Sequence, residues 1–393
     1  MENLFYDLVE EVVNFLPRKD VETIARVAKE SQDLENWSIA AEDHLEKRFL
    51  LDVDVHIERT GKWNDPKVRL SVKKTLPGGL EEDWNFKQWR YAWLHRVNIY
   101  LTSESTYKEV EMEQVLRSVS LPVDPSASGI LRLQENLRYP ENAACLIDLS
   151  QKVLQATQKD FSYVIINHSP FISTTVFDDF IADIITQGVF LEHVQHFCRR
   201  ETQQKIWEAA APLFEKKRGR PLEIKLWKNR LECEHMELII ESWLKSDGTY
   251  ESKEISYSAS DTAWRTLRDK YKQILGGDYC GYLVHPTRHS SLYVSKNKIR
   301  VEEYEPWHLP IDFHWIDSFI GKWKKEEIRH MFYRDRGFEF AFEDAEDWDK
   351  LVEKYGPLDG SIMSIVHPSG YALLQLKKKG EVFEAVMSKV QKT

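Results

Sequence analysis

Apolar residues near the start of the chain recur every three or four positions, which is the period of an amphipathic helix. Leu4, Leu8, Val12 and Leu16 follow this spacing, and acidic residues stand between them. Pro17 comes next and ends the pattern, because a proline disfavours the helical region for the residue before it. The spacing predicts a first helix that ends at residue 16.

The following sixty residues predict two more helices and a pair of strands. Asp20 can cap a second helix, and Val21 begins the apolar face of that helix. A third amphipathic stretch runs from about residue 39 to residue 49. Residues 51–57 and 68–72 then alternate between apolar and polar, which is the pattern of half-buried strands. We expect a small helical module followed by a β connector.

Helical and strand patterns alternate with a steady period from about residue 84 to residue 260. Strand candidates are centred near Ile99, Arg132, Val164, His193, Ile224 and Ser256. Each interval holds one helical pattern, and these patterns cover residues 107–118, 142–157, 174–187, 200–215 and 233–245. A strand–helix unit cannot bury its apolar face alone, so regular repetition predicts stacked neighbours. The constant period favours an α/β solenoid over a doubly wound sheet.

The last part of the chain contains a second repeat, with an offset of about 80 to 84 residues. Trp264 corresponds to Trp348, and Trp243 corresponds to Trp323. Further matched pairs are Ile255/Phe338, Tyr257/Phe340, Leu283/Ile365, Leu292/Leu374 and Val301/Phe383. We interpret this as an internal duplication of an α+β unit, with residues 305–310 as the linker.

Three tryptophans, at positions 84, 89 and 93, are spaced like one face of a helix. A helix here would cover the first end of the solenoid, as a cap must. Tryptophan is also enriched where proteins bind one another. The spacing does not decide between the two roles.

Composition and charge narrow the function. The 393 residues are 42% hydrophobic, which is enough for two or three folded units. A formal charge of −10 does not favour broad binding to nucleic acid or to anionic membranes. The four cysteines are far apart, and the apolar runs are too short to span a bilayer. We expect a reduced, intracellular protein of the cytoplasm or nucleus, with no membrane segment.

The motifs of common enzymes do not occur. The sequence contains no glycine-rich phosphate loop and no Gly-x-Ser-x-Gly elbow, so we assign no catalytic residue and no cofactor. His193 and His196 are suitable zinc ligands, but on a strand they would point to opposite faces, so we assign no metal site. The repeated dipeptides His285-Pro286 and His367-Pro368 are interpreted as strand ends.

One basic segment offers an alternative. Arg218-Gly219-Arg220-Pro221 is similar to the core of an AT-hook, in which arginines enter the minor groove of A/T-rich DNA. The same residues also fit a helix end: basic side chains lie in the last turn, Gly219 supplies a left-handed cap and Pro221 stops the helix. A DNA-associated protein is therefore one of the competing hypotheses.

Residues 4–21, LFYDLVEEVVNFLPRKDV, resemble an F-box. The family's apolar positions are matched by Leu8, Val12, Val13 and Leu16, and its Pro-x-x-Asp-Val by Pro17, Asp20 and Val21. Phe5 stands where the family has a proline. The segment HLEKR at 44–48, which leads into a strand, is similar to the divergent F-box group expanded in nematodes.

The resemblance implies a substrate-recognition subunit of a cullin-type, SCF-like ubiquitin ligase. In that family the F-box binds a Skp-type adaptor, and a downstream domain, often a leucine-rich-repeat array, selects a target protein. The residues implied to bind the adaptor are Leu4, Leu8, Val12, Leu16, Pro17, Asp20 and Val21. The target is not identified. A protein-interaction scaffold without a ligase role is the main alternative.

The predicted organisation is mixed α/β with four parts. An F-box-like helical module covers residues 1–50, and a β connector covers 51–80. A leucine-rich-repeat-like α/β array covers 81–260, and the duplicated α+β region covers 261–393.

Overall fold

The computed structural model describes residues 5–58, 65–75, 80–102, 107–124, 128–135, 143–167, 175–197, 204–271, 280–305, 308–325, 338–379 and 382–389. Leu4 and most of the turn expected between the first two strands lie outside these residues. The described chain contains eleven α-helices, one large sheet and one small sheet, so the mixed α/β class is confirmed. It divides into two compact units, residues 1–210 with 221–230, and residues 211–220 with 231–393.

The first unit begins with the three expected helices, α1 (Tyr6–Asn14), α2 (Arg18–Ala28) and α3 (Glu35–Lys47), with a short 3₁₀ helix η1 (Gln32–Leu34) before α3. Their shared core is small and consists of Val9, Val13, Val21, Ala25, Ala40 and Ala41. The prediction that Asp20 caps α2 is wrong. Pro17 is the residue before the helix, and Asp20 lies in its first turn, because the fixed φ of proline already prepares the start of a helix.

The large sheet has twelve strands in the order β10-β11-β12-β9-β8-β7-β6-β5-β4-β1-β2-β3. Six neighbouring strands, β8, β7, β6, β5, β4 and β1, are parallel. Beyond β1 the sheet continues with the antiparallel strands β2 and β3. The strands of the first unit are β1 (Phe49–Glu58), β2 (Lys67–Thr75), β3 (Glu81–Asp83), β4 (Ala92–Thr102), β5 (Ile130–Glu135), β6 (Tyr163–Asn167), β7 (His193–Phe197) and β8 (Leu222–Leu231).

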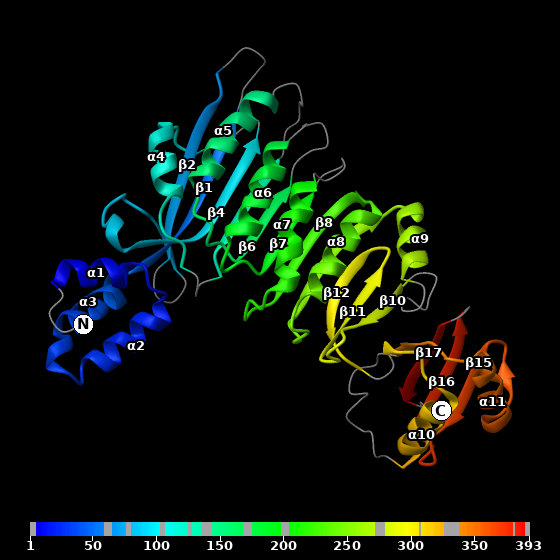
Figure 1. Ribbon diagram of the computed structural model, residues 1–393. Coiled ribbons are helices and arrows are strands. Elements are labelled where there is room, and N and C mark those ends of the chain that lie inside the picture. Colours follow the sequence, from blue (N-terminus) through cyan, green and yellow to red (C-terminus); the bar gives the residue numbers. More distant parts are fainter. Residues whose placement is uncertain are drawn as a thin grey trace. The chain divides into compact units, whose positions relative to one another are not determined.

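One face of this sheet is buried and the other is open. In β5, Leu131 and Leu133 are fully buried, whereas Arg132 between them is partly exposed, and β6 and β7 repeat the alternation. The strands β4 to β8 also follow one another in chain order, so right-handed crossovers place every connecting helix on the same face. Figure 1 shows α4 (Met112–Val119), α5 (Ala143–Ala156) and α6 (Thr175–Gln187) on one side of the strands.

The expected helix–strand alternation is present throughout the array. The helices α5, α6, α7 (Gln204–Glu215) and α8 (Cys233–Leu244) begin within four residues of the expected positions. The prediction of a helix around the tryptophans at 84, 89 and 93 is wrong. Trp84 follows β3, Trp89 opens the short 3₁₀ helix η2 (Trp89–Tyr91), and Trp93 lies in β4. Phe86 and Gln88 adopt positive φ angles, which a continuous helix excludes.

The second unit contains two copies of one arrangement. The first copy comprises α8, β9 (Lys253–Ala259), α9 (Asp261–Lys270), β10 (Cys280–Val284), β11 (Ser290–Ser295) and β12 (Lys298–Glu303). The second copy comprises α10 (Phe313–Lys324), β13 (Phe338–Phe340), α11 (Glu346–Tyr355), β14 (Leu358–Asp359), β15 (Ile362–Val366), β16 (Ala372–Lys379) and β17 (Val382–Lys389). The strand order β10-β11-β12-β9 recurs as β15-β16-β17-β13, so the repeat in sequence is also a repeat in topology.

Candidate functional site

The first helix presents apolar side chains on two faces. Val9 and Val13 point into the core of the helical module and are fully buried. Beside this buried side lie four residues that we call the α1 stripe; their exposed fractions are Phe5 80%, Leu8 50%, Val12 45% and Phe15 72%. Leu8 and Val12 lie on one side of α1, and Phe5 and Phe15 flank the two ends of the helix, each three residues further along the chain.

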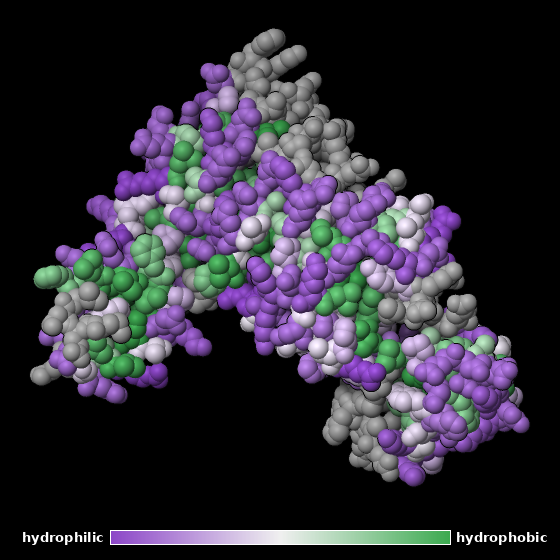
Figure 2. Space-filling model, in the orientation of Figure 1, coloured by the Kyte–Doolittle hydropathy of each residue, from purple (hydrophilic) through white to green (hydrophobic). Residues whose placement is uncertain are grey.

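Two further apolar side chains of the module face solvent, Val27 on α2 and Ile39 on α3. Figure 2 shows hydrophobic surface, in green, over this module. Single exposed apolar residues are ordinary on protein surfaces, but a contiguous apolar patch on a small module marks an interaction site. The α1 stripe is therefore the candidate docking surface.

The structure distributes the expected adaptor-binding residues between surface and core. Leu8 and Val12 belong to the α1 stripe, and Asp20 is exposed on α2. Leu16 is partly buried against the core, and Val21 is fully buried, so Val21 acts in folding. Pro17 is half-buried at the start of α2.

Sequence reasoning missed Phe5 and Phe15 as surface residues. The signal for both was present, because they extend the spacing of Leu8 and Val12 by three residues at each end.

Arg48 attaches the helical module to the sheet. Its guanidinium donates hydrogen bonds to the carbonyl oxygens of Leu16 at 2.8 Å and Val13 at 3.1 Å. These oxygens lie at the end of α1, where that of Val13 also accepts from the Leu16 N–H at 3.2 Å. The guanidinium also lies 4.2 Å from the ring centre of Trp93 in β4. Burial lowers the pKa of Arg48 to about 10. One side chain thus joins α1 and β4.

Two contacts reinforce this attachment. The Tyr91 hydroxyl donates to Asp43 Oδ2 at 2.5 Å, and Arg90 forms an ion pair with Glu10. Burial opposes ionisation of Asp43, but hydrogen bonds from Lys47 and Tyr91 outweigh it and lower the pKa of the carboxyl group. These contacts join α1 and α3 to the segment before β4. They fix the direction in which the α1 stripe faces.

The open face of the sheet is a second candidate surface. Because the strands are parallel and in register, side chains of six strands align in a row that consists of Asp54, Asn98, Arg132, Ile165, Gln195 and Lys225. Along this face Asn98 donates to Asp54 at 2.8 Å, and His193 Nδ1 lies 2.8 Å from Glu223 Oε2. Both charge signs and several aromatic rings are present. This mixture suits protein recognition better than uniform phosphate binding.

A groove of about 660 Å³ lies in the first unit on the helix-covered side of β2. Val68 and Leu70 of β2, with Phe86, Val110 and Met112, supply its apolar lining. Lysine and glutamate side chains of both signs also line it, so its charge does not indicate the kind of ligand that would fit.

The histidines considered for zinc lie on opposite faces of β7, as their spacing predicts. His193 is on the open face beside Glu223, whereas His196 is fully buried and lies 2.8 Å from Asp178 of α6. Within the described part of the chain, no group of three or more His, Cys, Asp or Glu side chains is arranged to hold a metal ion.

The AT-hook-like segment is folded into a turn. The N–H groups of Arg218 and Gly219 donate to the Glu251 carboxylate at distances between 2.5 and 3.0 Å, and Gly219 has a φ of +73°. An AT-hook needs an extended backbone in a groove of negative potential. The turn and the adjacent carboxylate favour the helix-end interpretation.

The two His-Pro dipeptides occupy equivalent places in the two copies. The His285 ring lies 5.0 Å from the Trp243 ring in an edge-to-face contact, and His367 lies 5.0 Å from Trp323 in the same way. His367 Nε2 also lies 3.1 Å from the Trp323 carbonyl oxygen, near the end of α10. Both histidines therefore hold a helix end against a strand end.

The comparisons with known proteins give no family. No protein-family model, no curated protein and no solved structure matches the chain. None of the described helices is long and apolar enough to cross a membrane.

Proposed function

We propose that this protein is a substrate-recognition adaptor of a cullin-type ubiquitin ligase. In this proposal the helical module binds a Skp-type adaptor, which links it to the cullin scaffold, and the array presents a target protein. The observation that carries the proposal is the α1 stripe, an apolar row that faces solvent although the core beneath it is complete. The resemblance of residues 4–21 to an F-box supports the same partner.

The energetics favour docking through the α1 stripe. Burying one large apolar side chain stabilises a complex by about 1.5–3 kcal/mol. Phe5 and Phe15 are the most exposed members of the row, so they have the most apolar area to lose on binding. The contacts of Arg48 keep the row in place before the partner arrives, which lowers the ordering cost of association.

The array supports the target-binding half of the proposal. Its strands follow one another in chain order, with helices on one face and the mainly polar row from Asp54 to Lys225 on the other. We interpret it as a solenoid-like support whose open face binds the target. We assign the chain no catalytic role and place its function in the cytoplasm or nucleus.

The test is binding of the full-length chain to a purified Skp-type adaptor. Leu8→Asp combined with Val12→Asp should weaken binding by at least about a hundredfold, because two apolar contacts are lost and two charges are desolvated. Val189→Asp is the matched control, since Val189 is 69% exposed but lies outside the helical module. It should bind like the unmodified chain.

Retention of binding by the double variant would exclude docking through the α1 stripe. A folded, unmodified chain that fails to bind the adaptor would favour the scaffold alternative. In that case the partners captured by the array should be unchanged when residues 1–50 are deleted.

A further inference from the structure

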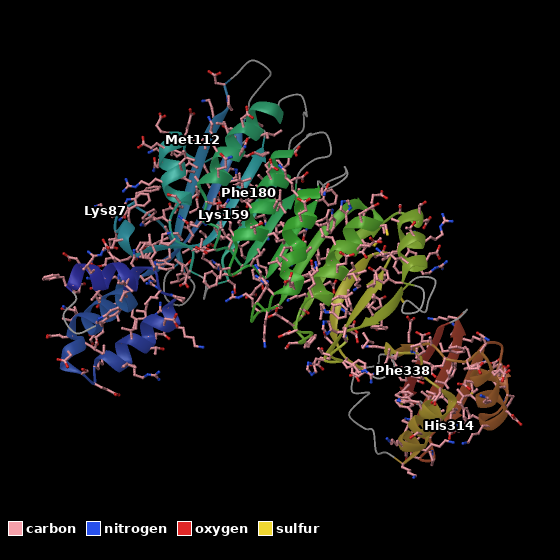
Figure 3. All side chains as sticks on the ribbon, viewed as in Figure 1. Lys87, Met112, Lys159, Phe180, His314 and Phe338 are labelled. Atoms are coloured by element: carbon pink, nitrogen blue, oxygen red, sulfur yellow. The ribbon has the colours of Figure 1, made fainter. Side chains whose placement is uncertain are left out.

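Partly buried cations of the first unit illustrate how such a charge is normally kept. The Lys159 ammonium lies 4.2 Å from the ring centre of Phe180 in α6 (Figure 3). At the antiparallel end of the sheet, Arg69 donates to Glu58 Oε1 at 2.6 Å. Moving a cation out of water costs free energy unless an anion, an aromatic ring or a hydrogen-bond acceptor replaces the water. The partners of Lys159 and Arg69 supply this replacement.

Arg132 on the open face of the sheet differs from its neighbours in this respect. On the same face, Arg96 of β4 lies 3.6 Å from Asp52, and Lys225 of β8 lies 2.6 Å from Glu223. Arg132 stands in β5, between the strands of these two cations. Among the described residues, no carboxylate forms an ion pair with it. Its charge is therefore left without a counterion in the described part of the chain.

The carboxylate in the same row as Arg132 is engaged elsewhere. Asp54 of β1 is aligned with Arg132 through Asn98 of β4. Two strand spacings of about 4.8 Å each separate their backbones. Asn98 donates to Asp54 Oδ1 at 2.8 Å. The Nε atom of Arg132 is shielded from solvent and has no hydrogen-bond partner among the described groups. A partly buried, unpaired guanidinium of this kind is costly to keep unless a ligand uses it.

Apolar side chains flank Arg132 on the open face. Ile165 of β6 is its neighbour in register, and Ile130 precedes it by two residues on the same side of β5. Both are partly exposed, and so is Tyr163, which is in register with Ile130. Arginine and tyrosine are enriched where proteins bind one another most strongly, because they combine a polar group with a large contact area. The surroundings of Arg132 thus suit a protein partner.

We propose that this face binds a segment of the target protein in which a glutamate or aspartate pairs with Arg132, while adjacent apolar residues cover Ile130 and Ile165. The planar guanidinium would donate two parallel hydrogen bonds to the carboxylate. The inference rests on the target-binding half of the proposed function, since it names the chemistry of the target at the open face.

A carboxylate matches the charge of this position better than a phosphate. Asp52 and Glu223 already neutralise Arg96 and Lys225, so Arg132 offers one positive charge. A carboxylate carries one negative charge and balances it. A phosphorylated side chain carries about −1.5 to −2 at neutral pH, and its excess negative charge would lie on the same face as Asp54.

The probe is a set of short synthetic peptides, each with a central glutamate between two apolar residues chosen from leucine, isoleucine and tyrosine. Matched sets carry glutamine or phosphoserine at the centre. Fluorescence anisotropy measures the binding of each labelled peptide to the full-length protein. We expect members of the glutamate set to bind saturably, at least about tenfold tighter than their glutamine counterparts. Binding by the phosphoserine set alone would overturn the choice of a carboxylate, and the absence of binding by every set would overturn the inference.

Arg132→Gln should weaken binding of the glutamate peptides by at least about tenfold, because the charge-assisted hydrogen bonds are lost. Arg132→Lys keeps the charge without the planar fork and should give an intermediate affinity. Arg117→Gln is the matched control, since Arg117 belongs to α4 on the helix-covered face and lies 4.2 Å from the Trp89 ring centre. It should bind like the unmodified chain. Equal affinities of the Arg132→Gln variant and the unmodified chain would contradict the pairing.

Two further readouts separate this inference from a structural role and from adaptor docking. Arg132 has no ion pair to lose among the described residues, so Arg132→Gln should unfold at the same temperature as the unmodified chain. A clearly lower unfolding temperature would assign Arg132 to folding instead. The variant should also bind a Skp-type adaptor as the unmodified chain does. A chain that binds the adaptor but none of the peptides would refute the inference alone. A chain that binds glutamate peptides through Arg132 but not the adaptor would refute the ligase role alone.

Discussion

The N-terminal helical module and the second C-terminal copy each bury a core of their own, but the two cores are built from different residues. The hydrophobic core of the module consists of valines and alanines, such as Val13 and Ala40, with larger side chains such as Trp37 only partly buried against it. The second copy buries large side chains, among them Trp323, Trp348 and Phe383. Hydrophobic stabilisation grows with the apolar area removed from water, so the second copy has the stronger core.

Polar contacts to the sheet add to the weaker core of the module. Arg48 satisfies the carbonyls at the end of α1 and stacks on Trp93, while Tyr91 donates to Asp43. The second copy is thus stabilised by its own core, whereas the module depends on its attachment to the sheet. The core of the module uses few apolar residues, and those of the α1 stripe remain exposed and available to a partner.

The largest expected effect is in the core of the second copy. Trp323→Ala removes a large buried side chain that packs on His367, so it should lower the free energy of unfolding of this region by about 3–5 kcal/mol. Chemical denaturation monitored by hydrogen exchange would measure the change. Tyr371→Ala is the matched control; this residue is 59% exposed, and its loss should cost less than about 0.5 kcal/mol. Equal losses of stability in the two variants would contradict the assignment of Trp323 to the core of the second copy.

A smaller loss is expected when the attachment of the module is removed. Arg48→Ala removes the hydrogen bonds to both carbonyls, of which that of Val13 keeps the Leu16 N–H as a donor, and should cost about 1–3 kcal/mol, with faster hydrogen exchange confined to α1, α2 and α3. Arg18→Ala is the control, because the ion pair that Arg18 forms with Glu22 is exposed. Unchanged hydrogen exchange in the module of the Arg48→Ala variant would show that the core of the module is enough to keep it folded.

The third effect is a pH dependence of the module. Burial lowers the pKa of His44 to about 4, with a smaller contribution from the charge of Arg48. The unfolded chain therefore takes up a proton first as the pH falls, so the module should lose stability from about pH 6.5 down to about pH 4.

His44→Phe keeps an aromatic ring at this position and cannot titrate, so it should flatten the pH dependence in the module. Hydrogen exchange of α3 at pH 7 and pH 5 provides the measurement. An identical pH response in the variant and the unmodified chain would assign the effect to a group other than His44.

The sequence predicted much of the fold because local patterns were consistent with the tertiary structure. The period of three and four placed the first helix, and the alternation of apolar residues placed β1 and β2. The offset between the copies paired Trp243 with Trp323, and both occupy equivalent places. The prediction of a helix around the tryptophans at 84, 89 and 93 was wrong, since helical spacing alone does not reveal the positive φ angles of Phe86 and Gln88.

The candidate site was only partly predictable. Leu8 and Val12 were expected on the surface of α1 and lie there, but Val21 is needed inside the small core. Which apolar face of α1 points outward depends on how α2 and α3 pack, and this is a tertiary property. The role of Arg48 was also hidden, because its partners at Leu16 and Val13 are more than thirty residues away in the sequence.

The central claim is that the α1 stripe binds a Skp-type adaptor, and the most direct measurement is calorimetric titration of the full-length protein with that adaptor. The account predicts saturable binding with one adaptor per chain and a negative heat-capacity change, the signature of apolar surface removed from water. A folded chain that produces no binding heat and no complex on size-exclusion chromatography would contradict it.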